Sequence, residues 1–141
     1  MSTGGSNTAV RSEVRLRSEQ TGGHASIVEI VAEAGFPGPP LHVHDFDEAF
    51  CVLDGELTFQ VEHDLMTKEA GDLAFVPRGV PHTLANRSGA SARYLLICTP
   101  AGFERSFARR AAEQAGLEPP PWALQPSPQV VFLGPRIDEE S

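Results

Sequence analysis

The sequence lacks the features of secreted, membrane-spanning and disulfide-bonded proteins. Its longest apolar run, around Leu95–Cys98, is far shorter than the ~20 residues of a membrane helix. The first residues, MSTGGSNTAV, contain neither the charged nor the apolar segment of a secretion signal. The two cysteines, Cys51 and Cys98, are therefore expected to be reduced, and the cytoplasm is the expected location.

Positive charge is also scarce. The formal net charge is −8, and no basic run is longer than Arg109–Arg110. Such a surface repels phosphate backbones, so nucleic acid is not expected as a partner. The 141 residues are enough for one domain with one core, and the 40% hydrophobic content is ordinary for a globular protein.

Short strand-like runs occupy residues 10–100, separated by turn residues about every ten positions. Leu57, Phe59 and Val61 alternate with polar residues, which predicts a strand with one buried face. Asp54–Gly55 stands between two such runs and predicts a tight type I′ hairpin. No helical periodicity occurs in this part, so the pattern predicts an all-β sandwich or barrel.

Residues 101–141 follow a different pattern. Phe103, Phe107 and Ala111 recur every four residues before Gly116, which predicts a helix that ends at this glycine. Its charged residues are interpreted as a solvated face; they are Arg105, Arg109, Arg110 and Glu113.

A proline-rich arm follows the predicted helix, and we expect it to pack on its own barrel or on a partner's. The chain is thus divided into a tail (1–9), a β-barrel domain (10–100) and a C-terminal helix with an extended arm (101–141). Exposed strand edges of a small barrel favour a homodimer, with Phe103–Leu133 helping to cover them.

Three histidines and a glutamate are candidate metal ligands. His42 and His44 share one strand face, about 6.6 Å apart, and Glu48 follows close behind. His82 opens a later strand, which a closed barrel can bring opposite the first pair. Taken alone, His42 and His44 are as well explained as two surface residues. Together, however, three imidazoles and a buried carboxylate are satisfied at once by a divalent cation.

Two segments resemble the conserved motifs of the cupin superfamily. Residues 71–86, GDLAFVPRGVPHTLAN, match the second cupin motif, and residues 42–55, HVHDFDEAFCVLDG, match the body of the first. The chain departs from the first motif at one position: the family's leading glycine would fall at Phe36, and this chain has Gly35 and Gly38 instead. The chain therefore resembles a small single-domain cupin.

This resemblance implies a fold, a site and a cofactor. The fold would be a double-stranded β-helix, the cupin jelly-roll barrel. His42, His44, Glu48 and His82 would hold one divalent transition metal, and the sequence does not choose among Mn, Fe, Co, Ni, Cu and Zn. His24 and His63 are expected on the surface.

The side chains expected to point into the barrel beside the ligands are mainly apolar: Phe46, Phe50, Val52, Phe59, Phe75 and Leu84. Few cations that could hold a phosphate are expected there, Arg93 being the main candidate. We therefore expect a small-molecule substrate or ligand of aromatic or polyketide-like character.

The first hypothesis is a metal-dependent oxygenase similar to quercetinase-like dioxygenases, with Glu48 as catalytic proton acceptor. A metal-dependent cyclase or isomerase is a related alternative. A non-catalytic small-molecule-binding or accessory cupin is the alternative from another class.

Overall fold

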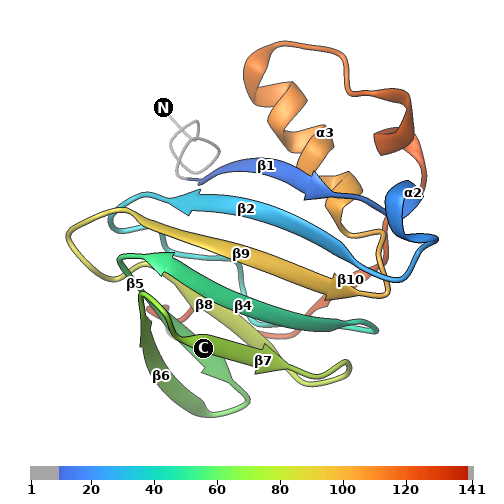
Figure 1. Ribbon diagram of the computed structural model, residues 1–141. Helices are drawn as coiled ribbons and strands as arrows, with labels where there is room; N and C mark the ends of the chain where they lie inside the picture. The colour runs from blue at the N-terminus through green and yellow to red at the C-terminus, as the bar shows by residue number, and fades with distance from the viewer. Residues whose placement is uncertain (1–9, 140–141) are drawn as a thin grey trace.

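The computed structural model describes residues 10–139, which form two antiparallel five-stranded sheets packed face to face (Figure 1). The first sheet has the order β1 (Val10–Leu16), β2 (Ser26–Ala32), β9 (Ala92–Thr99), β4 (Asp47–Asp54) and β7 (Leu73–Val76). The second has the order β10 (Val130–Phe132), β3 (His42–His44), β8 (His82–Ala85), β5 (Glu56–Val61) and β6 (Asp64–Glu69). The predicted all-β jelly-roll barrel is confirmed.

Alternating side chains build the core between the sheets. Along β2, Val28 and Ile30 point inward and are 1% exposed, whereas their neighbours are partly exposed. Phe50 of β4 contacts Phe59 of β5 across the interior, with ring centroids 5.0 Å apart. These contacts join the two sheets through one hydrophobic core.

The predicted hairpin at Asp54–Gly55 is wrong. β4 pairs with β7 and β9 in the first sheet, whereas β5 pairs with β6 and β8 in the second, so the chain crosses between sheets here. Gly55 has φ 77°, and a Cβ there would lie 2.6 Å from the Ser91 carbonyl oxygen. The glycine therefore permits a tight crossover. The hairpin nearby is β5–β6, with its turn at Glu62–His63.

Gly38 explains how the chain enters the first cupin-like motif. Its φ is 77°, and its backbone lies so close to β8 that a Cβ would overlap the Leu84 carbonyl oxygen. Thr83 donates its hydroxyl to the Pro39 carbonyl oxygen at 2.6 Å. The segment around Gly38 thus covers β8, all four residues of which are buried.

The C-terminal segment packs on its own barrel. Helix α3 (Glu104–Ala115) lies over β1 and ends at Gly116, whose left-handed conformation caps the helix as predicted (Figure 1). After the short turn η1 (Pro121–Leu124), β10 pairs antiparallel with β3. The arm is therefore the edge strand of the second sheet.

The buried carboxylate of Glu104 links the first helix to the start of α3. It accepts hydrogen bonds from the backbone amides of Ser18, in α2 (Ser18–Thr21), and Gly102, both at 2.6 Å.

Among residues 10–139, no helix has the length and apolar character needed to span a membrane.

Candidate metal centre

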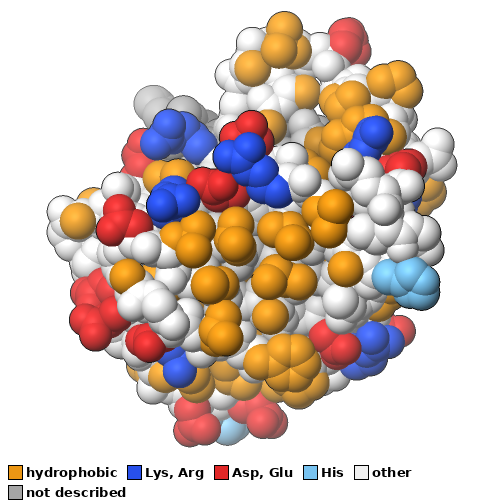
Figure 2. All heavy atoms as spheres, viewed as in Figure 1, with side chains coloured by type: hydrophobic (Ala, Val, Ile, Leu, Met, Phe, Trp, Pro, Cys, Tyr) orange, Lys and Arg blue, Asp and Glu red, His pale blue; other side chains and the backbone are white. Residues whose placement is uncertain are grey.

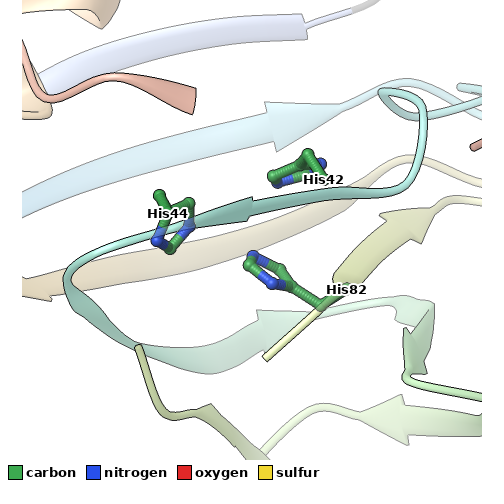
Figure 3. A group of neighbouring side chains, drawn as sticks. All are labelled: His42, His44 and His82. Atoms are coloured by element: carbon green, nitrogen blue, oxygen red, sulfur yellow. The ribbon is translucent and has the colours of Figure 1, made fainter. Parts of the chain in front are cut away.

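Three imidazole rings converge inside the barrel (Figure 3). His42 and His44 come from β3, and His82 is the first residue of β8, paired with His42 across the sheet. One ring nitrogen from each lies within 4.8 Å of the other two. His44 and His82 are only 5% and 3% exposed. This cluster could hold a metal ion.

A backbone carbonyl two residues away orients each ring. The Nδ1 atoms of His42, His44 and His82 lie 2.7, 3.1 and 2.8 Å from the carbonyl oxygens of Pro40, Phe46 and Val80 respectively. Because a carbonyl oxygen only accepts, each Nδ1 must carry the proton. A neutral ring then presents the lone pair of Nε2, which is the arrangement of metal-binding histidines.

Glu48 brings a carboxylate between two of these rings. Its Oε1 lies 3.0 Å from Nε2 of His44 and 2.7 Å from Nε2 of His82, and the side chain is almost fully buried. If His44 and His82 each carried protons on both ring nitrogens, two buried imidazolium ions would face the single carboxylate of Glu48. A single cation instead satisfies the lone pairs and the carboxylate together.

The spacing of these atoms fits one ion. Two ligand atoms each about 2.1 Å from a metal, at a right angle to one another, are about 3.0 Å apart. The separations of Glu48 Oε1 from the two Nε2 atoms are close to that value. The three histidines could therefore hold a transition metal ion, with Glu48 placed beside two of them.

Opposing effects act on the pKa of Glu48. Burial raises it, whereas hydrogen bonds from Nε2 of His44 and His82, when the ion-free rings carry a proton there, lower it below its ordinary value. Its Oε2 lies 4.0 Å from the Cys98 thiol, whose own pKa is raised by burial and by Glu48. Cys98 therefore stays protonated and can donate to the carboxylate.

A cavity of about 630 Å³ opens from the cluster toward α3 and the arm. His42, Glu48 and His82 lie on its wall, and aromatic residues make much of the rest: Phe36, Phe50, Phe103, Phe107 and Phe132. The volume and apolar lining suit a small organic molecule.

The predicted pocket residues divide into three groups. Phe50 and Leu84 line the cavity. Phe46, Val52 and Phe59 are at most 1% exposed and belong to the core, and Phe46 stacks on His44 with ring centroids 3.7 Å apart. The prediction for Phe75 is wrong, because its side chain faces out of the barrel and is 61% exposed.

The expectation about cations is also wrong. Arg93 is exposed on the outer face and pairs with Glu29, so it does not enter the interior. Instead Arg109 and Arg110 of α3 and Arg136 beyond β10 line the cavity. The sequence offered no signal for them, because only the fold of the arm brings them to this site. His24 and His63 are exposed, as expected.

A family model described as "Cupin domain" matches residues 28–98, half of the chain, including all four candidate ligands. The chain belongs to the cupin family. Cupins of known structure resemble it over most of the barrel. A predicted oxalate decarboxylase from Thermotoga maritima has a TM-score of 0.61 at 22% identity, covering 64% of this chain and 80% of that one.

Two further structures have a similar fold. A putative ethanolamine utilization protein Q from Salmonella typhimurium has a TM-score of 0.55 at 25% identity and covers 65% of this cupin and 70% of its own chain. The polyketide cyclase RemF from Streptomyces resistomycificus has a TM-score of 0.58 at 18% identity, covering 65% and 66%.

One curated protein matches part of the sequence. It is named endoribonuclease YbeY, from Myxococcus xanthus, and is 35% identical over 77 residues. The match covers 55% of this cupin but only 26% of that protein, so this chain spans about a quarter of its relative's length. The ribonuclease activity in the name is that of the Myxococcus protein.

Proposed function

We propose that this cupin is a metal-dependent oxygenase that acts on a small aromatic or polyketide-like molecule. The observation that carries the proposal is the position of His42, Glu48 and His82 on the wall of an aromatic cavity of about 630 Å³. An organic molecule inside that cavity would reach the ion-binding atoms directly.

Four residues would hold the ion: His42, His44, Glu48 and His82. When bound, the ion would supply a Lewis acid and, if redox-active, a route for electrons to dioxygen. Mixed nitrogen and oxygen ligands suit Mn, Fe, Co, Ni, Cu or Zn. The chain's own contribution is to hold the rings in one orientation through their carbonyl contacts.

Glu48 is the proposed proton acceptor. Its Oε1 lies between His44 and His82, and the residue lies on the cavity wall, within reach of a substrate hydroxyl. A carboxylate held in this position can take a proton without leaving the site. The aromatic walls would orient a planar substrate and exclude water.

We also propose a homodimer formed through the outer face of the first sheet. Figure 2 shows an apolar patch across this face, above β2, β9, β4 and β7. One row of side chains across it runs Ile27, Ile97, Ala49 and Phe75. Charged residues of both signs stand at its margins, including the Arg93–Glu29 pair. A flat apolar face with both signs at its rim suits a second copy of itself.

Oxygen consumption by metal-loaded protein tests the oxygenase proposal. Purified chain is loaded separately with each candidate metal and incubated with catechol-like and flavonol compounds, with and without air. We expect oxygen uptake with at least one redox-active metal, an oxygenated product by mass spectrometry, and loss of both in His82→Ala.

Other outcomes identify the alternatives. A product of unchanged oxygen content, formed equally without air, would identify a cyclase or isomerase. Saturable binding with every metal but no product would identify a binding module.

A further inference from the structure

Three arginines lie on the wall of the cavity, although the whole chain is acidic. Arg109, Arg110 and Arg136 line it, and Glu48, a candidate metal ligand, is the one carboxylate among the described lining residues. The chain's net charge is −8. This cavity is therefore a local positive region in a negative protein, and an ion at the site would add to the positive charge.

Arg110 lies at the end of a row of aromatic rings that leads to the metal site. Its guanidinium is 5.5 Å from the centre of the Phe107 ring. Phe107 contacts Phe103 at 5.3 Å, and Phe103 lies 6.1 Å from the ring of His44. An apolar ligand along this wall would thus have a cation at one end and the imidazoles at the other.

Arg136 approaches from a second wall. Its Nε donates to the Gly38 carbonyl oxygen at 2.9 Å, in the segment that also supplies the Pro40 carbonyl to His42. The Glu139 carboxylate accepts from Nη1 of Arg136 at 3.3 Å and from its backbone amide at 3.0 Å. Both side chains are more than one-third exposed, so the ion pair is weak, and Arg136 also lies on the cavity wall.

The donors of Arg109 are directed at the arm rather than into the cavity. It donates to the carbonyl oxygens of Ala123 and Gln125 and to the Ser127 hydroxyl, which holds the arm against α3. Within residues 10–139, no carboxylate forms an ion pair with Arg109 or Arg110. Arg110 is exposed and lines the cavity, so its guanidinium is open both to solvent and to a molecule that enters the cavity.

From these contacts we infer that the substrate is an apolar carboxylic acid, whose carboxylate is held by Arg110 and Arg136. The inference rests on the proposed function, since it names the substrate class of the same site. A monoanion is favoured over a phosphate because the donors of Arg109 are engaged by the arm, which leaves Arg110 and Arg136 as the cations of the cavity wall.

Binding of matched probes tests the inference. Affinities for 2-naphthoate, the neutral isostere 2-naphthamide and 2-naphthyl phosphate are measured by calorimetry on wild type and on Arg110→Gln, Arg136→Gln and Arg93→Gln. The last variant is the matched control, because Arg93 lies on the outer face. Since a metal ion itself attracts carboxylates, each titration is repeated on metal-stripped protein, with its fold checked by circular dichroism.

We expect 2-naphthoate to bind roughly tenfold or more tightly than the amide, with and without metal. Each of Arg110→Gln and Arg136→Gln should weaken the acid about five- to tenfold and leave the amide unchanged, whereas Arg93→Gln should change neither. Equal affinities for acid and amide, no binding of either, or insensitivity to both cavity variants would overturn the inference. Tighter binding of 2-naphthyl phosphate than of 2-naphthoate would show that the site prefers a phosphate group, and would overturn the inference of a carboxylic acid.

The two proposals fail separately. A selective acid site in a protein that takes up no metal would leave this inference standing and remove the oxygenase. Metal uptake and turnover with no preference for acids would support the oxygenase proposal and overturn the inference of a carboxylic acid substrate.

Discussion

At the scale of single residues, backbone carbonyls orient the rings of the candidate metal centre. Each histidine directs its Nδ1 proton to a carbonyl two residues away, so the ring is already oriented before an ion arrives. One oxygen of Glu48 lies beside Nε2 of His44 and His82, and the other lies near the Cys98 thiol. The site is therefore preorganised within a folded barrel.

Replacing a single histidine should separate metal binding from folding. We expect His42→Ala or His82→Ala to lower metal content from about one ion per chain to near zero, measured by elemental analysis after dialysis. The far-ultraviolet circular dichroism should be unchanged, because much of the core is independent of the ion. His63→Ala, in the exposed β5–β6 turn, is the control and should retain the metal. Unfolding of either ligand variant would show that the metal is structural.

Glu48→Gln should weaken metal binding while keeping the shape of the side chain. The amide carries no charge to offset the ion, so we expect the affinity to fall by at least the roughly 10–100-fold that losing an outer-shell partner costs. Competition with a fluorescent chelator measures this. An unchanged affinity would mean that the three histidines hold the ion without the carboxylate.

At the scale of elements, the sequence predicted where the strands lie better than it predicted which strands pair with one another. Alternating burial along Ser26–Ala32 follows directly from having one face in the core. In Glu56–Val61, Thr58 is buried as well as Leu57 and Phe59, because β5 is an inner strand of its sheet. The Asp54–Gly55 signal reports only a tight bend with positive φ, which suits a crossover between sheets as well as a hairpin. Residues 73–76 are apolar throughout, so the sequence could not show that Val76 faces in and Phe75 out.

The arm depends on α3 for its position, and Arg109 makes three of the hydrogen bonds between them. We expect Arg109→Ala to lose three hydrogen bonds and lower the free energy of unfolding by about 1–3 kcal/mol. Limited proteolysis should then cut the arm between residues 116 and 129 faster than in wild type. Glu113→Ala, exposed on the same helix, is the control. Equal cleavage rates in the two variants would show that the contacts of Arg109 do not hold the arm.

At the scale of the whole molecule, the site is completed by parts that sequence motifs do not describe. The cupin motifs identify the four candidate ligands because each motif fixes several residue types at set spacings. The cavity walls instead come from α3 and the arm, whose arginines look like an ordinary solvated helix face. Arg105 and Arg109 in fact bind carbonyl oxygens of the arm. Such contacts depend on tertiary packing, which short-range patterns do not encode.

The apolar face of the first sheet gives a prediction about assembly. Light scattering at micromolar concentration should give the mass of a dimer for wild type and of a monomer for Phe75→Asp, because the aspartate would bury a charge in the interface. Leu65→Asp is the control: Leu65 is 56% exposed but lies on β6 of the second sheet, and this variant should remain a dimer. A monomeric wild type would refute the proposed interface.

The central claim is that one ion is bound by three imidazoles and a carboxylate inside the barrel. Anomalous diffraction from crystals of the cobalt-loaded protein tests it directly. The account predicts a single strong peak per chain within bonding distance of Nε2 of His42, His44 and His82 and of a carboxylate oxygen of Glu48. A peak elsewhere on the chain, or none at full cobalt loading, would contradict it.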